Sequence, residues 1–248
     1  MYFWSLLHKS FRSQALYFFE FLISNMQFVL QGVLTILIGL YTNSVTQSYS
    51  ELELLQYYAF GVGFLLFFTR NYIVRNFEEE VVNATLITKL VRPYNFLLFV
   101  VLRNLTHLLP KAIMSFSIFI IIMSIFFTFP LTLPVVFRSF IGILFALSMV
   151  YLVAAIFCQL ALILERVDDL FRIVVMAIFF AGGGFIPLAM LPSFIQYLPT
   201  SFIYFHPLNY IISGNYAFAI LGFTYAIILL LINIVLYKKI RKHIEVNG

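Results

Sequence analysis

The sequence predicts an all-α integral membrane protein with six transmembrane helices, an N-terminal interfacial amphipathic helix and short re-entrant helices before the last span. Of its 248 residues, 63% are apolar and 10% are charged, whereas soluble domains contain about 45–50% apolar and about 25% charged residues. Because a soluble core cannot bury so much hydrocarbon, the outer surface must face lipid. At roughly 20 residues per span, residues 1–248 form one transmembrane domain and leave no length for a soluble catalytic domain.

Residues 1–20 predict an amphipathic helix that lies in the membrane surface. Apolar residues recur there at helical spacing, opposite Lys9 and Arg12. A cleaved signal peptide is the alternative, but the basic residues follow the first apolar run and no small-residue cleavage pattern appears. We therefore expect this segment to be retained.

The six spans are expected where the chain carries almost no charge. These stretches are approximately residues 21–42, 54–70, 112–129, 139–164, 172–190 and 216–237. An even number of spans places both termini on one side, and of the 15 lysines and arginines all but Arg138 fall on that side. Basic residues collect on the cytoplasmic face, so we expect a multi-pass protein of the cell membrane with both termini cytoplasmic. The net charge of +5 then requires no nucleic-acid partner.

A helix on the cytoplasmic face is predicted within the loop of residues 71–95. Three glutamates occupy its first turn near the positive end of the helix dipole, and Pro93 ends it. Its apolar residues share one side, which makes it either a docking surface or an interfacial connector without a partner. The residues of interest are Phe77, Glu78, Glu79, Glu80, Val81, Leu86 and Arg92. A second charged loop, Glu165–Arg172, contains Asp168 and Asp169 and by itself indicates only a solvated turn.

The segment 182–212 is apolar and aromatic but cannot form one long helix. Gly182–Gly184 and Pro187 break the fifth span, and Pro192 and later prolines prevent a long helix from forming again. Irregular backbone at membrane depth must be covered by protein or line a cavity, so short re-entrant helices over the outer mouth are one interpretation. An outer loop that rests on the lipid headgroups is the other.

The sequence contains no pattern typical of an enzyme. No GxxxxGK[ST] or HExxH motif is present, the four histidines are scattered, and the single Cys158 is expected to be a small buried residue. We therefore expect no catalytic, cofactor or metal site. The middles of the spans contain no acidic or basic residue, which argues against ion coupling through a buried acid but leaves backbone-coordinated sodium open.

Neutral polar residues are present within the spans. Ser24, Gln27, Gln31 and Thr35 lie on one stripe of the first helix. This stripe must avoid lipid, and it either lines a pathway or hydrogen-bonds a neighbouring helix. Gln159 and Asn233 are isolated and are expected to be satisfied within the bundle.

Three local sequences, in this order of elements, carry a family resemblance. Leu90-Val91-Arg92-Pro93 opens the third span, Gly184-x-x-Pro187 and then Leu191-Pro192 follow the fifth, and a segment with Pro207 leads to the sixth. Together with the interfacial helix and the basic tail, the chain resembles over its whole length the membrane subunit of type-2 ATP-binding-cassette exporters.

The resemblance implies a permease that pairs with a second copy or a close relative, above two separate ATPase subunits that bind ATP and magnesium. It implies that the helix Phe77–Leu90 is a coupling helix that docks on the ATPase, with Asp168 and Asp169 in a lesser contact. The resemblance also implies which residues form the translocation pathway and its outer gate. Gln27, Gln31 and Thr35 would line the pathway, and Gly184, Pro187 and Pro192 would belong to the gate.

Two other functions remain open at this point. A vitamin-binding membrane component of an energy-coupling importer also has about six spans and relies on external ATPases, but it binds its ligand as an isolated monomer. A membrane enzyme or assembly factor that acts on lipids is supported only by the polar stripe, and the sequence lacks a pair of residues that could act as acid and base. Family members export drugs, peptides, lipids or glycans, and nothing in the sequence selects among them.

Overall fold

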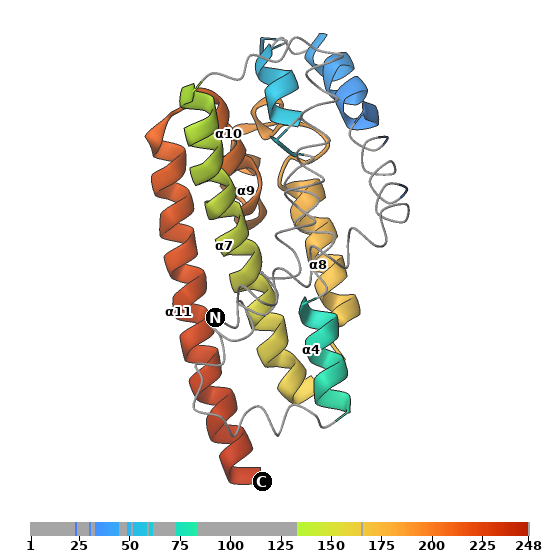
Figure 1. Cartoon of the computed structure of the whole chain (residues 1–248), viewed down its shortest axis with the longest axis vertical. Helices are drawn as coiled ribbons and strands as arrows, with labels where there is room; N and C mark the ends of the chain where they lie inside the picture. The colour runs from blue at the N-terminus through green and yellow to red at the C-terminus, as the bar shows by residue number, and fades with distance from the viewer. Residues whose placement is uncertain are drawn as a thin grey trace.

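The computed structural model describes residues 23, 30, 33–44, 49–50, 52–58, 60–61, 73–83, 133–164 and 166–247. Within these ranges the chain is helical or forms the turns between helices, and it contains no β-strand. The predicted all-α class is therefore confirmed for this part of the chain (Figure 1).

The described helices differ greatly in length. They are α4 (Ile73–Val82), α7 (Leu133–Leu164), α8 (Asp168–Ala181), the 3₁₀ helices η1 (Leu188–Met190) and η2 (Ser193–Tyr197), α9 (Pro199–Ile203), α10 (Phe205–Ser213) and α11 (Tyr216–Asn247). Residues Val33–Ser44 form a shorter apolar helix, and residues 52–58 are also helical.

Two long helices, α7 and α11, run side by side through the bundle (Figure 1). Each has 32 residues, which corresponds to a length of about 48 Å. Within them, Phe137–Leu164 and Tyr216–Ile240 are long and apolar enough to cross a membrane. These windows contain the predicted spans 139–164 and 216–237, so both spans are confirmed as long apolar helices.

The remaining predicted spans are covered only in part. Val33–Ser44 lies at the end of the first one, and residues 54–58 and 60–61 lie within the second. The third span, 112–129, and the N-terminal helix, 1–20, lie outside the described residues. The total of six spans therefore stays a prediction.

The fifth predicted span ends earlier than expected. α8 begins at Asp168 and ends at Ala181, not near residue 190. Gly183 has a φ of +97°, which lies in the region that L side chains rarely adopt, so the helix cannot continue through it. The backbone therefore leaves the helix at Gly183, the second of the three glycines, and the prolines only begin the short helices that follow.

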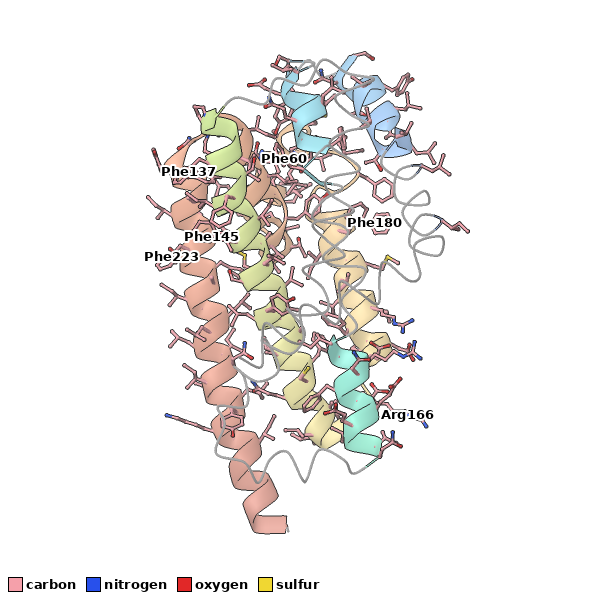
Figure 2. The ribbon with its side chains drawn as sticks, viewed as in Figure 1. Phe60, Phe137, Phe145, Arg166, Phe180 and Phe223 are labelled. Atoms are coloured by element: carbon pink, nitrogen blue, oxygen red, sulfur yellow. The ribbon has the colours of Figure 1, made fainter. Side chains whose placement is uncertain are left out.

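α7 and α11 bury very different shares of their surfaces. In the apolar window of α7, 56% is buried inside the protein, but only 17% of the window of α11 is buried. Phe145 of α7 and Phe223 of α11 make an edge contact with ring centroids 6.4 Å apart, and Figure 2 shows both rings on the outward side of the helix pair. The α11 helix is thus a peripheral helix that exposes apolar side chains along most of its length.

A buried polar joint connects the last turns of α7 to the middle of α11. The Nε2 of Gln159 donates to the Oδ1 of Asn233 at 2.9 Å, and both side chains are 0% exposed. The Nδ2 of Asn233 donates to the carbonyls of Leu152 at 3.0 Å and Leu229 at 2.9 Å. Asn233 is therefore satisfied within the bundle, as expected, whereas the Oε1 of Gln159 is buried without a partner. The adjacent Cys158 is fully buried, which confirms the expectation of a small interior residue.

Candidate functional site

The candidate functional residues gather at the two ends of the bundle, which we call the α4 end and the α10 end. In Figure 1 α4 lies beside the last turns of α7 and the first turns of α8. The short helices η1, η2, α9 and α10 lie at the opposite end, where α7 and α11 begin (Figure 1). The α8 helix connects the two ends.

The α4 helix has one face buried against the bundle and one face exposed. Ile73, Val74 and Phe77 are at most 5% exposed and contribute to the hydrophobic core, and Val81 packs partly buried against the same core. These residues recur at offsets of three and four, which is the spacing of one helix face. The expected adherent side is therefore packed within this chain, and the surface available to another molecule is the opposite side of α4.

The three glutamates do not lie in the first turn of their helix as expected, because α4 begins at Ile73 and ends at Val82. They have different environments. The Oε2 of Glu78 accepts hydrogen bonds from the backbone N–H groups of Val167 at 2.7 Å and Asp168 at 2.8 Å. Glu79 is exposed and pairs with Arg75 on the same helix at 3.1 Å, and Glu80 is half-buried. Of the three glutamates, only Glu79 is exposed.

The contact of Glu78 completes the beginning of α8. The first N–H groups of an α-helix have no partner within the helix, and the side chain of the preceding residue usually supplies one. The preceding residue here is Val167, which makes no side-chain cap. A carboxylate from α4 takes that role instead and places its negative charge at the positive end of the α8 dipole.

Most other charges at the α4 end are exposed. Asp168 pairs with Arg172 one turn along α8 at 2.7 Å, and Asp169 is exposed to solvent. Arg166, labelled in Figure 2, is also exposed near α4. Three predicted residues of this region, Leu86, Arg92 and Glu165, lie outside the described residues. The described charges leave a polar surface around the partly buried contact of Glu78.

At the α10 end, two tyrosines hold the turn that follows α8, which we call the glycine turn (residues 182–185). Tyr57 donates from its hydroxyl to the carbonyl of Gly183 at 2.9 Å, and Tyr58 donates to the carbonyl of Phe185 at 2.8 Å. A Cβ on Gly183 would lie 2.7 Å from the Tyr57 hydroxyl oxygen. A Cβ on Gly184 would lie 2.7 Å from the carbonyl oxygen of Phe179. The glycines therefore allow both the backbone turn and the close approach of the helix that carries the tyrosines.

The prolines of this segment begin the short helices. Pro187 precedes η1 and accepts from the N–H of Met190 at 2.9 Å, and Pro192 precedes η2 and accepts from the N–H of Ile195 at 3.0 Å. Pro187 is buried, whereas Pro192 is exposed. The predicted gate residues therefore have separate places: Gly184 and Pro187 lie within the packed turn, and Pro192 lies on the surface of the α10 end.

The α10 helix is buried along nearly its whole length. Every residue from Phe205 to Ile211 is buried. The ring of His206 stacks on that of Phe202, with ring centroids 4.7 Å apart, and it contacts the tilted ring of Phe218, with ring centroids 5.4 Å apart. Its Nε2 makes a hydrogen bond with the carbonyl of Gln196 at 3.1 Å. The helix is covered by protein on all sides, unlike a loop that only rests on a surface.

Polar contacts also tie α10 to its neighbours. Tyr49 donates to the Oδ1 of Asn209 at 3.1 Å, and burial raises the pKa of the Tyr49 hydroxyl to about 12. Arg138, on the first turns of α7, donates from its guanidinium to the carbonyl of Ile212 at 3.4 Å. A cation near the last carbonyls of a helix stabilises the negative end of its dipole. Arg138, the one basic residue predicted outside the cytoplasmic side, thus has a structural role at the end of α10.

Only part of the predicted pathway can be located. Gln27 and Gln31 lie outside the described residues. Thr35 is 4% exposed and lies on the same helix face as Ile36 and Asn43, which are also buried. This face of Val33–Ser44 is turned toward the rest of the protein.

The sequence did not indicate the tyrosine contacts or the partner of Glu78. A run of three glycines is a signal for a close approach, but it does not say which segment approaches. Among the described residues, no group of three or more His, Cys, Asp and Glu side chains could hold a metal ion. No family model, no curated protein and no solved structure matches this chain.

Proposed function

We propose that this chain is the permease subunit of an ATP-binding-cassette exporter in the cell membrane. In this proposal it crosses the membrane six times with both termini cytoplasmic, and it forms the translocation pathway with a second copy or a close relative. Separate ATPase subunits bind ATP and magnesium and supply the energy. The composition, the two long apolar helices and the resemblance to type-2 exporters support this proposal.

The observation that carries the proposal is the construction of α4. A helix that receives force from a motor subunit must be fixed to the bundle on one side and accessible on the other. The face with Ile73, Val74 and Phe77 provides the fixed side, and Arg75, Glu79 and Val82 are exposed on the other. In this arrangement the exposed side is the ATPase contact, and the α4 end is the cytoplasmic end.

The α10 end then serves as the outer gate. Non-helical backbone is tolerated at membrane depth only where protein covers it or where it lines a cavity. The burial of residues 205–211 of α10 supports the re-entrant interpretation over a loop on the headgroups. The glycine turn and the prolines give this region the breaks that allow short helices to pack over a cavity. Thr35, together with Gln27 and Gln31, would line the pathway beneath it.

The proposal is tested by gentle purification from the native membrane. We expect the chain alone to hydrolyse no ATP, and we expect it to be recovered with a GxxxxGK[ST] protein that does. If the chain alone, reconstituted in vesicles, accumulated solute against a gradient, the proposal would be wrong. High-affinity binding of a vitamin by the isolated monomer would favour the importer component instead.

The contact surface is tested by a charge reversal on the exposed side of α4. Glu79→Lys should reduce recovery of the ATPase several-fold, because it reverses a charge on the proposed contact. Its cost in stability should be small, since Glu79 forms an exposed ion pair with the neighbouring Arg75. Lys238→Glu is the matched control, since it reverses an exposed charge on α11. Equal recovery with both variants would remove α4 from the contact.

A further inference from the structure

We infer that Glu78 is a positioning residue that transmits movement of α4 to α8, and through α8 to the glycine turn. This inference rests on the proposed function, because it requires that an ATPase move α4. It differs from a direct role of Glu78 in docking: the carboxylate acts on another element of the same chain.

The first step is the contact between α4 and α8. One carboxylate oxygen of Glu78 accepts from two successive backbone N–H groups, 89 and 90 residues further along the chain. Hydrogen bonds in which one group is ionised are among the strongest in proteins. The bonds go to backbone atoms, so a displacement of α4 acts on the helix itself and not on a mobile side chain. Glu78 is only half exposed, which limits the competition of water for its carboxylate.

The second step is the stiffness of α8. Its sequence from Asp168 to Ala181 contains no glycine and no proline, and an uninterrupted α-helix of 14 residues is about 21 Å long. One face of α8 is buried through Phe171, Val175 and Ile178, and Phe171 packs against Phe157 of α7 with ring centroids 5.3 Å apart. The helix can therefore shift or rotate against α7 as one body.

The third step is the far end of α8. The N–H of Gly182 donates to the carbonyl of Ile178, and the N–H of Gly184 donates to that of Phe179. The carbonyl of Gly183 in turn accepts the hydroxyl of Tyr57. A movement of α8 thus acts on a turn held by a second segment of the chain, and the short helices of the α10 end follow directly. Glu78 at one end and Tyr57 at the other fix the two ends of α8.

The experiment uses the complex of the full chain with its ATPase and one reporter cysteine. Cys158→Ala removes the single native cysteine, and Ser193→Cys introduces a thiol on the exposed helix η2. The rate of maleimide labelling is measured without nucleotide and with magnesium, ATP and vanadate. In this parent we expect the nucleotide to change the labelling rate several-fold.

Glu78→Ala is expected to abolish that change while the ATPase is still recovered and still hydrolyses ATP. Glu78→Gln, which keeps an acceptor oxygen without the charge, is expected to retain part of the response. Lys238→Gln, at an exposed position on α11 outside the proposed contact, is the control for the loss of one charge. Leu229→Ala is the control for a general loss of stability, because it removes a buried side chain of α11 away from α4 and α8. Both controls should respond as the parent does.

The outcomes separate the inference from the proposed function. A full nucleotide response in Glu78→Ala would overturn the inference and leave the proposed function intact. Loss of the ATPase from a folded Glu78→Ala chain, judged by its elution and melting temperature, would also overturn it, because Glu78 would then be a docking residue. If the parent itself recovers no ATPase, the proposed function fails. If the parent recovers the ATPase but its Ser193→Cys thiol does not respond to nucleotide, only the inference fails.

Discussion

Gly183 is a residue at which both the backbone conformation and the surrounding side chains restrict substitution. Its φ of +97° is rarely adopted by L residues, and an added Cβ would also meet the Tyr57 hydroxyl oxygen at 2.7 Å and the Cγ of Leu188 at 3.1 Å. Backbone strain of this kind costs about 1–3 kcal/mol. We expect Gly183→Ala to lower the melting temperature of the detergent-solubilised protein.

Gly222→Ala is the matched control for this substitution. Gly222 lies within α11, and an added Cβ would meet only the flexible end of Met149, at 3.3 Å. Alanine also favours a helix over glycine by about 1 kcal/mol. Gly222→Ala should therefore melt at or above the temperature of the unmodified protein, and equal losses in the two variants would contradict the assignment of Gly183 to a strained turn.

Tyr49 makes the stability of the folded protein depend on pH in the alkaline range. Burial is the main cause that raises its pKa from 10.0 to about 12, and the charge of Glu53 acts in the same direction. The folded chain thus binds this proton more tightly than the unfolded chain. The corresponding stability is fully present below about pH 10 and is lost as the pH approaches about 12.

The Tyr49→Phe variant tests this dependence. It removes the ionising group, so its melting temperature should fall less steeply between about pH 10 and about pH 12 than that of the unmodified protein. Tyr197→Phe, at an exposed position, should change the slope little. Identical slopes for all three proteins would show that the Tyr49 hydroxyl is not buried in the folded protein.

At the scale of elements, the joint between α7 and α11 has the clearest energetic consequence. Interhelical polar bonds in membranes contribute about 0.6 kcal/mol each, with a maximum of about 1.7 kcal/mol. Asn233→Leu would remove three hydrogen bonds at once and leave the amide of Gln159 unpaired. We expect a loss of about 1–3 kcal/mol, measured as a lower melting temperature.

A double-mutant cycle distinguishes the joint from two separate polar residues. Gln159→Leu combined with Asn233→Leu removes both partners, so less stability should be lost than the sum of the single substitutions. Additive losses would mean that the two amides do not interact.

The sequence predicts elements well where one physical property decides them. α7 and α11 follow from apolar stretches that are too long for anything but a membrane-length helix, and the end of the helix before the glycine turn follows from Gly182–Gly184 and Pro187. The sequence does not predict the residue at which α8 ends, because the φ of Gly183 and not the first proline ends this helix. The partner of Glu78 is 89 residues away along the chain, and no local pattern contains that pairing.

At the scale of the whole molecule, the orientation of the chain can be measured directly. In a Cys158→Ala background, Ser193→Cys should react with a membrane-impermeant maleimide applied to intact cells, because we assign the α10 end to the outside. Asn83→Cys, exposed at the end of α4, should react only after permeabilisation. A membrane-permeant maleimide that labels both positions serves as the control, and external labelling of Asn83→Cys would reverse the proposed orientation.

The lightly buried surface of α11 has a consequence for how this protein tolerates change. Only 17% of its apolar window is covered by the rest of the chain, and side chains such as Ile220, Phe223, Ile227 and Leu231 are exposed. Hydrocarbon solvates leucine, isoleucine, valine and phenylalanine almost equally well, so these four positions are interchangeable among aliphatic and aromatic residues. Asn233, on the opposite side, is not interchangeable, because its side chain makes three hydrogen bonds. The sequence requirements of this helix are therefore concentrated on its buried side.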